Sequence, residues 1–229
     1  MNYELEIMNY ELVMGGWYYQ ALAGLLSSGG LLLRTPFIIH TSQFIINADH
    51  RVLLAINHAR TPALDAVMTF ASQIKVWFPF YAVLLGWLIY HFRRRAGRLL
   101  LLLAATVALA DSITSRIFKP WAARPRPCHA ADLAAQLYLP DGCGGQYGFM
   151  SSHAANAMGL AVFLLLTLPA GRFRALKIGV FLWALLISYS RVYLAAHYPL
   201  DVLGGWLLGA ALGAGAAWAF RRWDGVRTG

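Results

Sequence analysis

Two histidines and one aspartate are the residues of this sequence whose types and spacing could perform catalysis. His197 and Asp201 are four residues apart, which is one helical turn where the chain is helical. A carboxylate bound to one imidazole nitrogen fixes the tautomer and raises the nucleophilicity of the other nitrogen. His197 is therefore a candidate nucleophile, and His153, from another segment, is a candidate general acid for a leaving oxygen.

Cationic and hydroxyl side chains accompany the histidines and predict an anionic ligand. Arginine guanidinium groups bind phosphate oxygens in a bidentate fashion. Residues just before a helix offer free backbone N–H groups and the positive end of the helix dipole. The same groups would stabilise charge on a transferring phosphoryl group, with no need for a metal or a cofactor. The expected phosphate-binding residues are Lys119, Arg126, Ser151, Ser152 and Arg191.

Long apolar segments must position these side chains. The chain is 59% hydrophobic and 13% charged, whereas soluble domains carry about a quarter charged residues. We predict membrane spans, each near the twenty-residue length that crosses a bilayer, at roughly 76–92, 99–118, 154–170, 175–195 and 201–220. Residues 17–33 are a weaker candidate span, and helical spacing over 43–70 predicts helices at the interface or capping the bundle. The expected fold is all-α, a polytopic membrane bundle of about six helices.

The net charge of +9 could indicate a nucleic-acid partner, but the positions of the arginines argue against it. Arginines cluster at the ends of apolar segments, around 93–98, 172–177 and 221–227, as they do in short cytoplasmic loops. This topology leaves 119–150 as an outer loop and places the candidate catalytic residues at the outer face. We therefore expect a membrane partner and no nucleic acid.

The outer loop 119–150 is rich in proline and glycine and cannot continue a helix. It holds both cysteines, Cys128 and Cys143. An extracytoplasmic loop permits a disulfide between them, and two free thiols are the alternative.

Three motifs in order resemble the type 2 phosphatidic acid phosphatase family, integral membrane lipid phosphatases related to vanadium haloperoxidases. The first, Lys, six residues, Arg-Pro, is matched by Lys119 through Arg126-Pro127. The second, Pro-Ser-Gly-His, is matched imperfectly by Met150-Ser151-Ser152-His153. The third, Ser-Arg, five residues, His, three residues, Asp, is matched in full by Ser190, Arg191, His197 and Asp201.

The resemblance implies a haloperoxidase-like phosphatase core and a role for each matching residue. His197 would be the nucleophile that forms a phosphohistidine, His153 the acid, and Asp201 the partner that orients His197. Lys119, Arg126, Ser151 and Arg191 would bind phosphate. The second motif departs from the family pattern at Met150 and Ser152. Activity survives this departure if the Ser152 backbone still donates to phosphate, and is impaired if that contact needs glycine.

The resemblance also suggests a substrate. By analogy with short relatives whose site faces outward, we expect undecaprenyl diphosphate. The alternatives are phosphatidylglycerophosphate, phosphatidic acid and a lipid A phosphate. A phosphotransferase would have the same sequence features, and a non-enzymatic lipid-phosphate-binding or transport module is the rival from another class. The expected location is the bacterial cytoplasmic membrane, multi-pass, with the site on the periplasmic or extracytoplasmic side; oligomeric state stays open.

We expect residues 1–40 to be an N-terminal extension, peripheral or a weak span, before a phosphatase domain at 41–222 and a cytoplasmic tail at 223–229. Structural roles compete with functional ones at some charged residues. Arg191 and Asp201 could form a purely structural ion pair, and Asp111 could neutralise Lys119 or Arg116. Arg116 and Arg124 are expected to lie outside the phosphate site.

Overall fold

The computed structural model describes residues 35–223. The candidate span 17–33, most of the expected extension 1–40 and nearly all of the tail 223–229 lie outside the described residues. The chain divides into two units, Met1–Asn47 and Ala48–Gly229. Within the first unit only the start of helix α2 is described, and the site lies in the second.

Every regular element between residues 35 and 223 is a helix, which confirms the all-α prediction. The predicted interfacial segment 43–70 forms part of two helices, and each predicted span falls on a helix of its own. The helices are α2 (Thr35–His58), α3 (Pro62–Ser72), α4 (Phe78–Phe92), α5 (Ala96–Ser112), α6 (Lys119–Ala122), α7 (Ser152–Thr167), α8 (Arg174–Tyr193) and α9 (Pro199–Trp223).

Three helical stretches are long and apolar enough to cross a membrane: Ile74–Ala122, Arg174–Tyr193 and Pro199–Trp223. The first is a hairpin of α4 and α5, because the short turn Arg93–Arg95 reverses the chain between them. α7 is apolar but shorter, and it packs in the middle of the bundle, with ten of its residues from Ser152 to Leu164 buried. The protein is therefore a helical membrane protein.

Helices α7 and α9 pack closely because α9 presents small residues to α7. A Cβ on Gly209 would lie 2.2 Å from the Ala155 carbonyl oxygen, and one on Gly213 would lie 2.4 Å from that of Gly159. Spacing small residues four apart lets helix backbones approach in this way. The contact continues to the helix starts, where the Ser151 N–H donates to the Asp201 carbonyl at 3.0 Å. Helix packing therefore brings the second and third motifs together.

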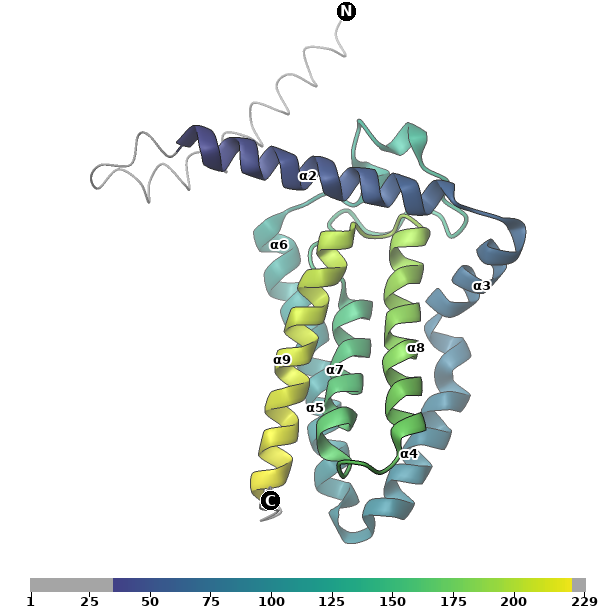
Figure 1. Ribbon diagram of the computed structural model, residues 1–229, viewed down its shortest axis with the longest axis vertical. Helices are drawn as coiled ribbons and strands as arrows, with labels where there is room; N and C mark the ends of the chain where they lie inside the picture. Colours follow the sequence, from purple (N-terminus) through teal and green to yellow (C-terminus); the bar gives the residue numbers. More distant parts are fainter. Residues whose placement is uncertain (1–34, 224–229) are drawn as a thin grey trace, which may run out of the picture. The chain divides into compact units, whose positions relative to one another are not determined.

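Figure 1 shows that α7 and α9 begin, and α8 ends, at one end of the bundle. The connections from α4 to α5 and from α7 to α8 lie at the opposite end, where α9 also finishes. These latter segments carry the arginine clusters, including Arg93–Arg95 and Arg221–Arg222. The candidate site and the basic clusters thus occupy opposite ends of the bundle.

The loop between α6 and α7 is folded back on itself by a short antiparallel pairing. Pro125 and Tyr147 form a bridge. The Arg126 N–H donates to the Gln146 carbonyl and the Gly148 N–H donates to that of Arg124, both at 2.9 Å. This pairing presents the two arginines of the loop to the starts of α7 and α9.

Candidate active site

Ser151 and His153 stand at the start of α7, where the sequence predicted an anion site. Ser151 is the N-cap residue, and its hydroxyl accepts from the Ala154 N–H at 3.4 Å. Serine suits the N-cap position, because its side-chain oxygen accepts from an N–H of the first turn that has no carbonyl partner within the helix. The remaining free N–H groups of the first turn are available to an anion.

His197 and Asp201 meet in a site closed to solvent. The His197 Nδ1 lies 3.4 Å from the Asp201 Oδ2, and the two side chains are 2% and 0% exposed. His197 precedes α9, and the carboxylate in the first turn of that helix also accepts from the Tyr198 N–H at 3.1 Å. Burial lowers the pKa of His197 to about 4, although Asp201 opposes the shift, so the imidazole is neutral at pH 7.

Three cations from separate segments, Lys119, Arg126 and Arg191, lie near the histidines. His153 lies near enough to interact electrostatically with Arg191, His197, Arg126 and Lys119. The Arg126 guanidinium is fixed by donation to the Tyr147 and Ala196 carbonyls, each at 3.3 Å. Arg191 donates to the Ser72 hydroxyl, and its buried Nε has no hydrogen-bond partner within the described chain. This unpaired donor suits an anionic ligand.

Ser152, the departure from the family motif, turns its hydroxyl toward α5 and α6. Its Oγ lies 2.7 Å from the Thr114 hydroxyl and receives a hydrogen bond from the Lys119 Nζ at 3.2 Å. Thr114 belongs to a π-helical turn, Ile113–Phe118, which directly precedes Lys119. Such turns are frequent at functional sites because they re-aim the residues that follow. Ser152 therefore fixes the position of Lys119.

Two structural ion pairs that the sequence left open are not formed within 4 Å among residues 35–223, although Asp111 does interact electrostatically with Lys119. Asp201 pairs with Arg124, at 2.7 Å between Oδ1 and NH1, rather than with Arg191. Arg124 was expected to be a residue outside the phosphate site; it does lie in the loop, and the loop pairing also delivers it to the buried carboxylate of Asp201. Asp111 forms no ion pair within 4 Å with Lys119 or Arg116 in the described part of the chain.

Sequence reasoning missed two further residues at the site, Arg124 and Asp49. The Arg124 NH2 donates to the Asp49 Oδ2 at 2.5 Å, and the Asp49 Oδ1 accepts from the Leu200 N–H at 2.8 Å. The alternation Arg124-Pro125-Arg126-Pro127 could have singled out Arg124, because alternating residues of an extended loop share a face. Asp49 had no local signal, since it lies 75 residues from Arg124.

A largely apolar cavity of about 800 Å³ opens beside the polar cluster, among helices α4, α5, α7 and α8. Its walls include Tyr81, Leu103 and Trp183, and Ser152 and His153 lie at its polar end. Asp111 also lines it, as the one acidic residue among the described lining residues. A phosphate bound near His153 would therefore leave room for an attached hydrocarbon.

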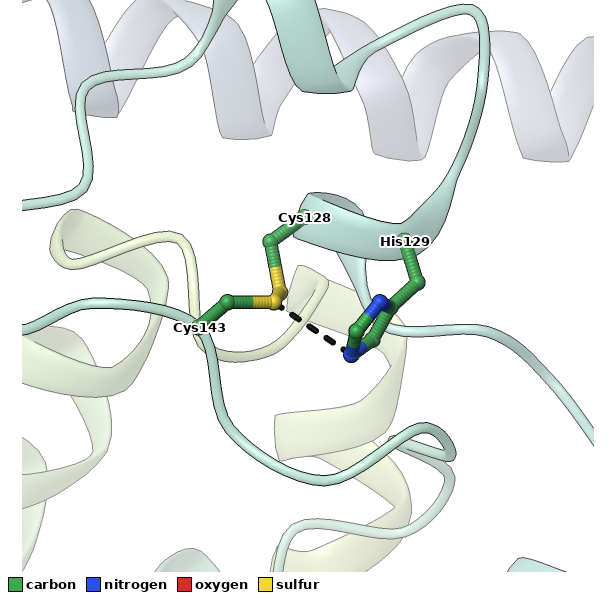
Figure 2. Close-up of side chains that lie close together, drawn as sticks. All are labelled: Cys128, His129 and Cys143. Carbon is green, nitrogen blue, oxygen red and sulfur yellow. Dashed lines mark hydrogen bonds between the residues drawn. A yellow bond between two sulfur atoms is a disulfide. The ribbon is translucent and has the colours of Figure 1, made fainter.

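Cys128 and Cys143 form a disulfide across the loop, with Cα atoms 5.8 Å apart. Figure 2 shows His129 beside it, with its Nε2 3.3 Å from the Cys143 sulfur. These three are the only His, Cys or acidic residues between 35 and 223 that are grouped closely enough to hold a metal ion. A cysteine binds a metal as its thiolate, and the disulfide leaves neither Cys128 nor Cys143 in that form. The group is thus a loop clasp in this oxidised state.

Comparison with known proteins identifies relatives of this arrangement. The profile of the "PAP2 superfamily" matches residues 99–224. A "Lipid A 4'-phosphatase" of Bacteroides thetaiotaomicron is 34% identical over 181 residues, or 78% of this chain and 77% of the relative. An "Undecaprenyl-diphosphatase" of Sulfolobus acidocaldarius is 34% identical over 158 residues, or 68% of this chain and 70% of the relative.

Solved structures agree with these relatives. The crystal structure of Aquifex aeolicus LpxE has a TM-score of 0.53 and 30% identity, covering 72% of this chain and 92% of its own. A transmembrane PAP2-type phosphatidylglycerolphosphate phosphatase from Bacillus subtilis has a TM-score of 0.58 and covers 95% of this chain and 98% of its own; at 23% identity it supports the fold alone.

The fold, the polar cluster and these similarities define a class, the integral membrane lipid phosphatases. Within that class the chain belongs to the PAP2 superfamily. The resemblance read from the three motifs is thereby confirmed at the level of the family.

Proposed function

We propose that this protein hydrolyses the phosphate monoester of a lipid through a phosphohistidine formed on His197. One observation carries the proposal: the buried imidazole of His197 faces the Asp201 carboxylate and lies within electrostatic range of the cations Arg126 and Arg191. The carboxylate holds the Nδ1–H, which leaves the Nε2 lone pair free to attack phosphorus. The cations balance the charge of the transferring group.

The reaction has two balanced steps. First, the anionic phosphate offsets the charges of the surrounding cations and allows His153 to be protonated. The His197 Nε2 then forms a bond to phosphorus while the bond from phosphorus to the leaving oxygen breaks, and His153 gives that oxygen its proton. Second, a water molecule loses a proton to His153, its oxygen binds phosphorus, and the P–N bond breaks to release inorganic phosphate. His153 thus acts as acid and then as base, as microscopic reversibility requires.

The apolar cavity supports a lipid as the carrier of the phosphate. It begins at His153 and Ser152 and extends along apolar walls. A cavity of this size suits a hydrocarbon chain, because burying each CH₂ contributes about 0.8 kcal/mol. His153, which lines that end of the cavity, also interacts electrostatically with His197, so a phosphate bound there would lie near both histidines.

Among lipid phosphates we propose a lipid A phosphate as the first substrate. The Bacteroides thetaiotaomicron relative with that printed activity aligns with more of this chain than the undecaprenyl-diphosphatase of Sulfolobus acidocaldarius does, 78% against 68%, at the same 34% identity. Undecaprenyl diphosphate, the expectation from the sequence, is the second candidate, and the Sulfolobus acidocaldarius relative supports it.

The proposed orientation places the site on the extracytoplasmic side of a cytoplasmic membrane. Two observations support it. The arginine clusters Arg93–Arg95 and Arg221–Arg222 lie at the opposite end of the bundle, as the positive-inside rule requires. The Cys128–Cys143 disulfide lies in the loop on the site's own end, where an oxidising compartment would preserve it.

Phosphate release by the purified full-length protein in detergent tests the proposal. The substrates are lipid A phosphate, undecaprenyl diphosphate and phosphatidylglycerophosphate, each with and without a metal chelator. We expect release to survive chelation and to be abolished in His197→Ala. Rapid quenching with ³²P-labelled substrate should trap acid-labile label on the wild type, and more of it in variants whose second step is slow.

The other outcomes separate the rival functions. Release that persists in His197→Ala would contradict the phosphohistidine mechanism. Release that requires an added alcohol acceptor would identify a phosphotransferase. Tight binding of every lipid phosphate without turnover would favour a non-enzymatic binding module. Release from undecaprenyl diphosphate alone would retain the mechanism and reverse the order of the two substrates.

A further inference from the structure

The Arg124 guanidinium is held between two buried carboxylates. Its NH1 donates to the Asp201 Oδ1 at 2.7 Å, and its NH2 donates to the Asp49 Oδ2 at 2.5 Å. The carboxylate side chains are 0% and 1% exposed, and that of Arg124 is 22% exposed. The guanidinium also lies over the Tyr198 ring, 3.9 Å from its centroid. Burial disfavours the charge of Arg124, but Asp201 and Asp49 outweigh burial and raise its pKa, so the guanidinium stays protonated.

Each oxygen of Asp201 has a separate partner. Arg124 occupies Oδ1, whereas Oδ2 faces the His197 Nδ1 at 3.4 Å and the Tyr198 N–H at 3.1 Å. Arg124 thus fixes the rotation of the carboxylate so that Oδ2 points at the imidazole. Without this contact a fully buried carboxylate would lose its counterion, and turning toward another donor would relieve the cost.

Asp49 completes the arrangement from another helix. Its two oxygens are divided between Arg124 and the Leu200 N–H, which belongs to the first turn of α9. Asp49 therefore ties α2 both to the arginine and to the backbone beside Asp201. Two carboxylates and one guanidinium carry a formal charge of minus one, so one negative charge is left for His197. That charge is what an imidazole needs when it becomes cationic on bonding to phosphorus.

We propose that Arg124 and Asp49 are positioning residues, which hold the Asp201 carboxylate aimed at His197 during phosphoryl transfer. This inference rests on the proposed function, since it assigns a task within that reaction. Neither is a defining residue of the three motifs, since Arg124 falls among the six unspecified residues of the first motif and Asp49 lies outside all three. Both act through Asp201 and make no contact with the His197 ring.

The test compares Arg124→Met, Arg124→Lys, Asp49→Asn and the double variant Arg124→Met/Asp49→Asn in the full-length protein. We expect Arg124→Met to lower kcat on the order of 10-fold to 100-fold, as loss of an outer-shell orienting group does at metal sites. KM should change little, because the phosphate-binding side chains are untouched. Arg124→Lys should recover part of kcat. Arg116→Met is the matched control, since Arg116 is an exposed arginine on the segment before α6, and its kcat should equal that of the wild type.

Two readouts distinguish positioning from a general loss of structure. Because Asp49 acts through Arg124, the double variant should lose no more activity than Arg124→Met alone. The acidic limb of the kcat/KM profile should move to higher pH in Arg124→Met, because a positive charge beside Asp201 is lost, and should not move up in Asp49→Asn. The other charged groups near His197, namely Arg126, Arg191 and His153, are unchanged in every variant.

Additive losses in the double variant, a rise in KM at constant kcat, or an unshifted acidic limb would overturn the inference. If Arg124→Met does not fold, the kcat and KM of the isosteric variant Asp49→Asn test the inference instead. A wild-type kcat in Asp49→Asn would refute the role of Asp49 and the proposal that its contact with Arg124 acts on Asp201. Failure of the proposed function has a different signature: activity in His197→Ala contradicts the phosphohistidine, whatever the Arg124 variants do.

Discussion

The Lys119 ammonium donates to the hydroxyl of Ser152, the residue that stands where the family motif has glycine, at 3.2 Å. A departure from the motif thus serves to hold a phosphate-binding cation. The Thr114 hydroxyl, 2.7 Å from the same oxygen, completes the anchor. The backbone of Ser152, in the first turn of α7, stays free to donate to an anion.

This anchor predicts that Ser152→Ala and Ser152→Gly both weaken substrate binding. Losing one hydrogen bond to a charged group costs about 1.5–3 kcal/mol, so KM should rise about tenfold or more with little change in kcat. Steady-state kinetics on the lipid substrate would measure it. A higher kcat/KM in Ser152→Gly would instead mean that the serine impedes the site and that the family glycine is better.

The burial of His197 predicts the pH dependence of the reaction. The nucleophile must be neutral, and burial lowers its pKa to about 4, from an ordinary value of about 6.5. Activity should therefore persist as the pH falls through 6 and be lost only as it approaches 4. The kcat/KM profile of the free enzyme would show this, with Arg126, Arg191, Asp201 and His153 as the charged groups near the ring. An acidic limb centred near 6.5 would contradict a buried, neutral nucleophile.

The disulfide predicts a link between the loop and the phosphate site. Cys128 and Cys143 are 15 residues apart, and closing such a loop contributes about 3 kcal/mol in the chain-entropy model. The neighbouring Gly144 packs on Arg126, since a Cβ there would lie 2.8 Å from NH1. We expect Cys128→Ser/Cys143→Ser to lower the free energy of unfolding by about that amount. Its KM should also rise, and unchanged thermal stability and kinetics would show that the loop needs no clasp.

The close packing of α7 and α9 predicts that Gly209 cannot be enlarged. A Cβ there would meet the Ala155 carbonyl oxygen at 2.2 Å, so Gly209→Ala must push the helices apart. Overpacking of this kind costs about 1–3 kcal/mol, and the midpoint of thermal unfolding in detergent should fall. Gly215→Ala on the same helix is the matched control, since a Cβ there meets nothing within 4 Å. Equal stabilities in the two variants would contradict the packing.

Asp111 predicts a difference between the two candidate substrates. Its carboxylate lines the apolar cavity and interacts electrostatically with Lys119, but it forms no ion pair within 4 Å among residues 35–223. Charge within a membrane protein is costly unless it is used. A lipid A phosphate carries hydroxyl and amide donors close to its phosphate, whereas a polyprenyl chain carries none. Asp111→Leu should therefore lower kcat/KM for lipid A phosphate by more than for undecaprenyl diphosphate. Equal losses for both would limit Asp111 to an electrostatic effect on Lys119.

The sequence by itself determined the membrane class, the spans and the three motifs. Hydrophobic length is a local property, so 76–92 or 201–220 could be recognised as a span without knowing its neighbours. The spacing of His197 and Asp201 is equally local. The membership of the chain in this family followed from the three motifs, and the comparisons confirm it.

Only the tertiary structure decided which cation faces which carboxylate. Asp201 could have paired with Arg191 or Arg124, and the choice depended on how the loop after α6 folds back across the bundle. Asp49 joined the site because α2 lies beside the start of α9, a contact that no spacing in the sequence records. Paired charges depend on the directions of side chains from distant segments, and packing alone sets those directions.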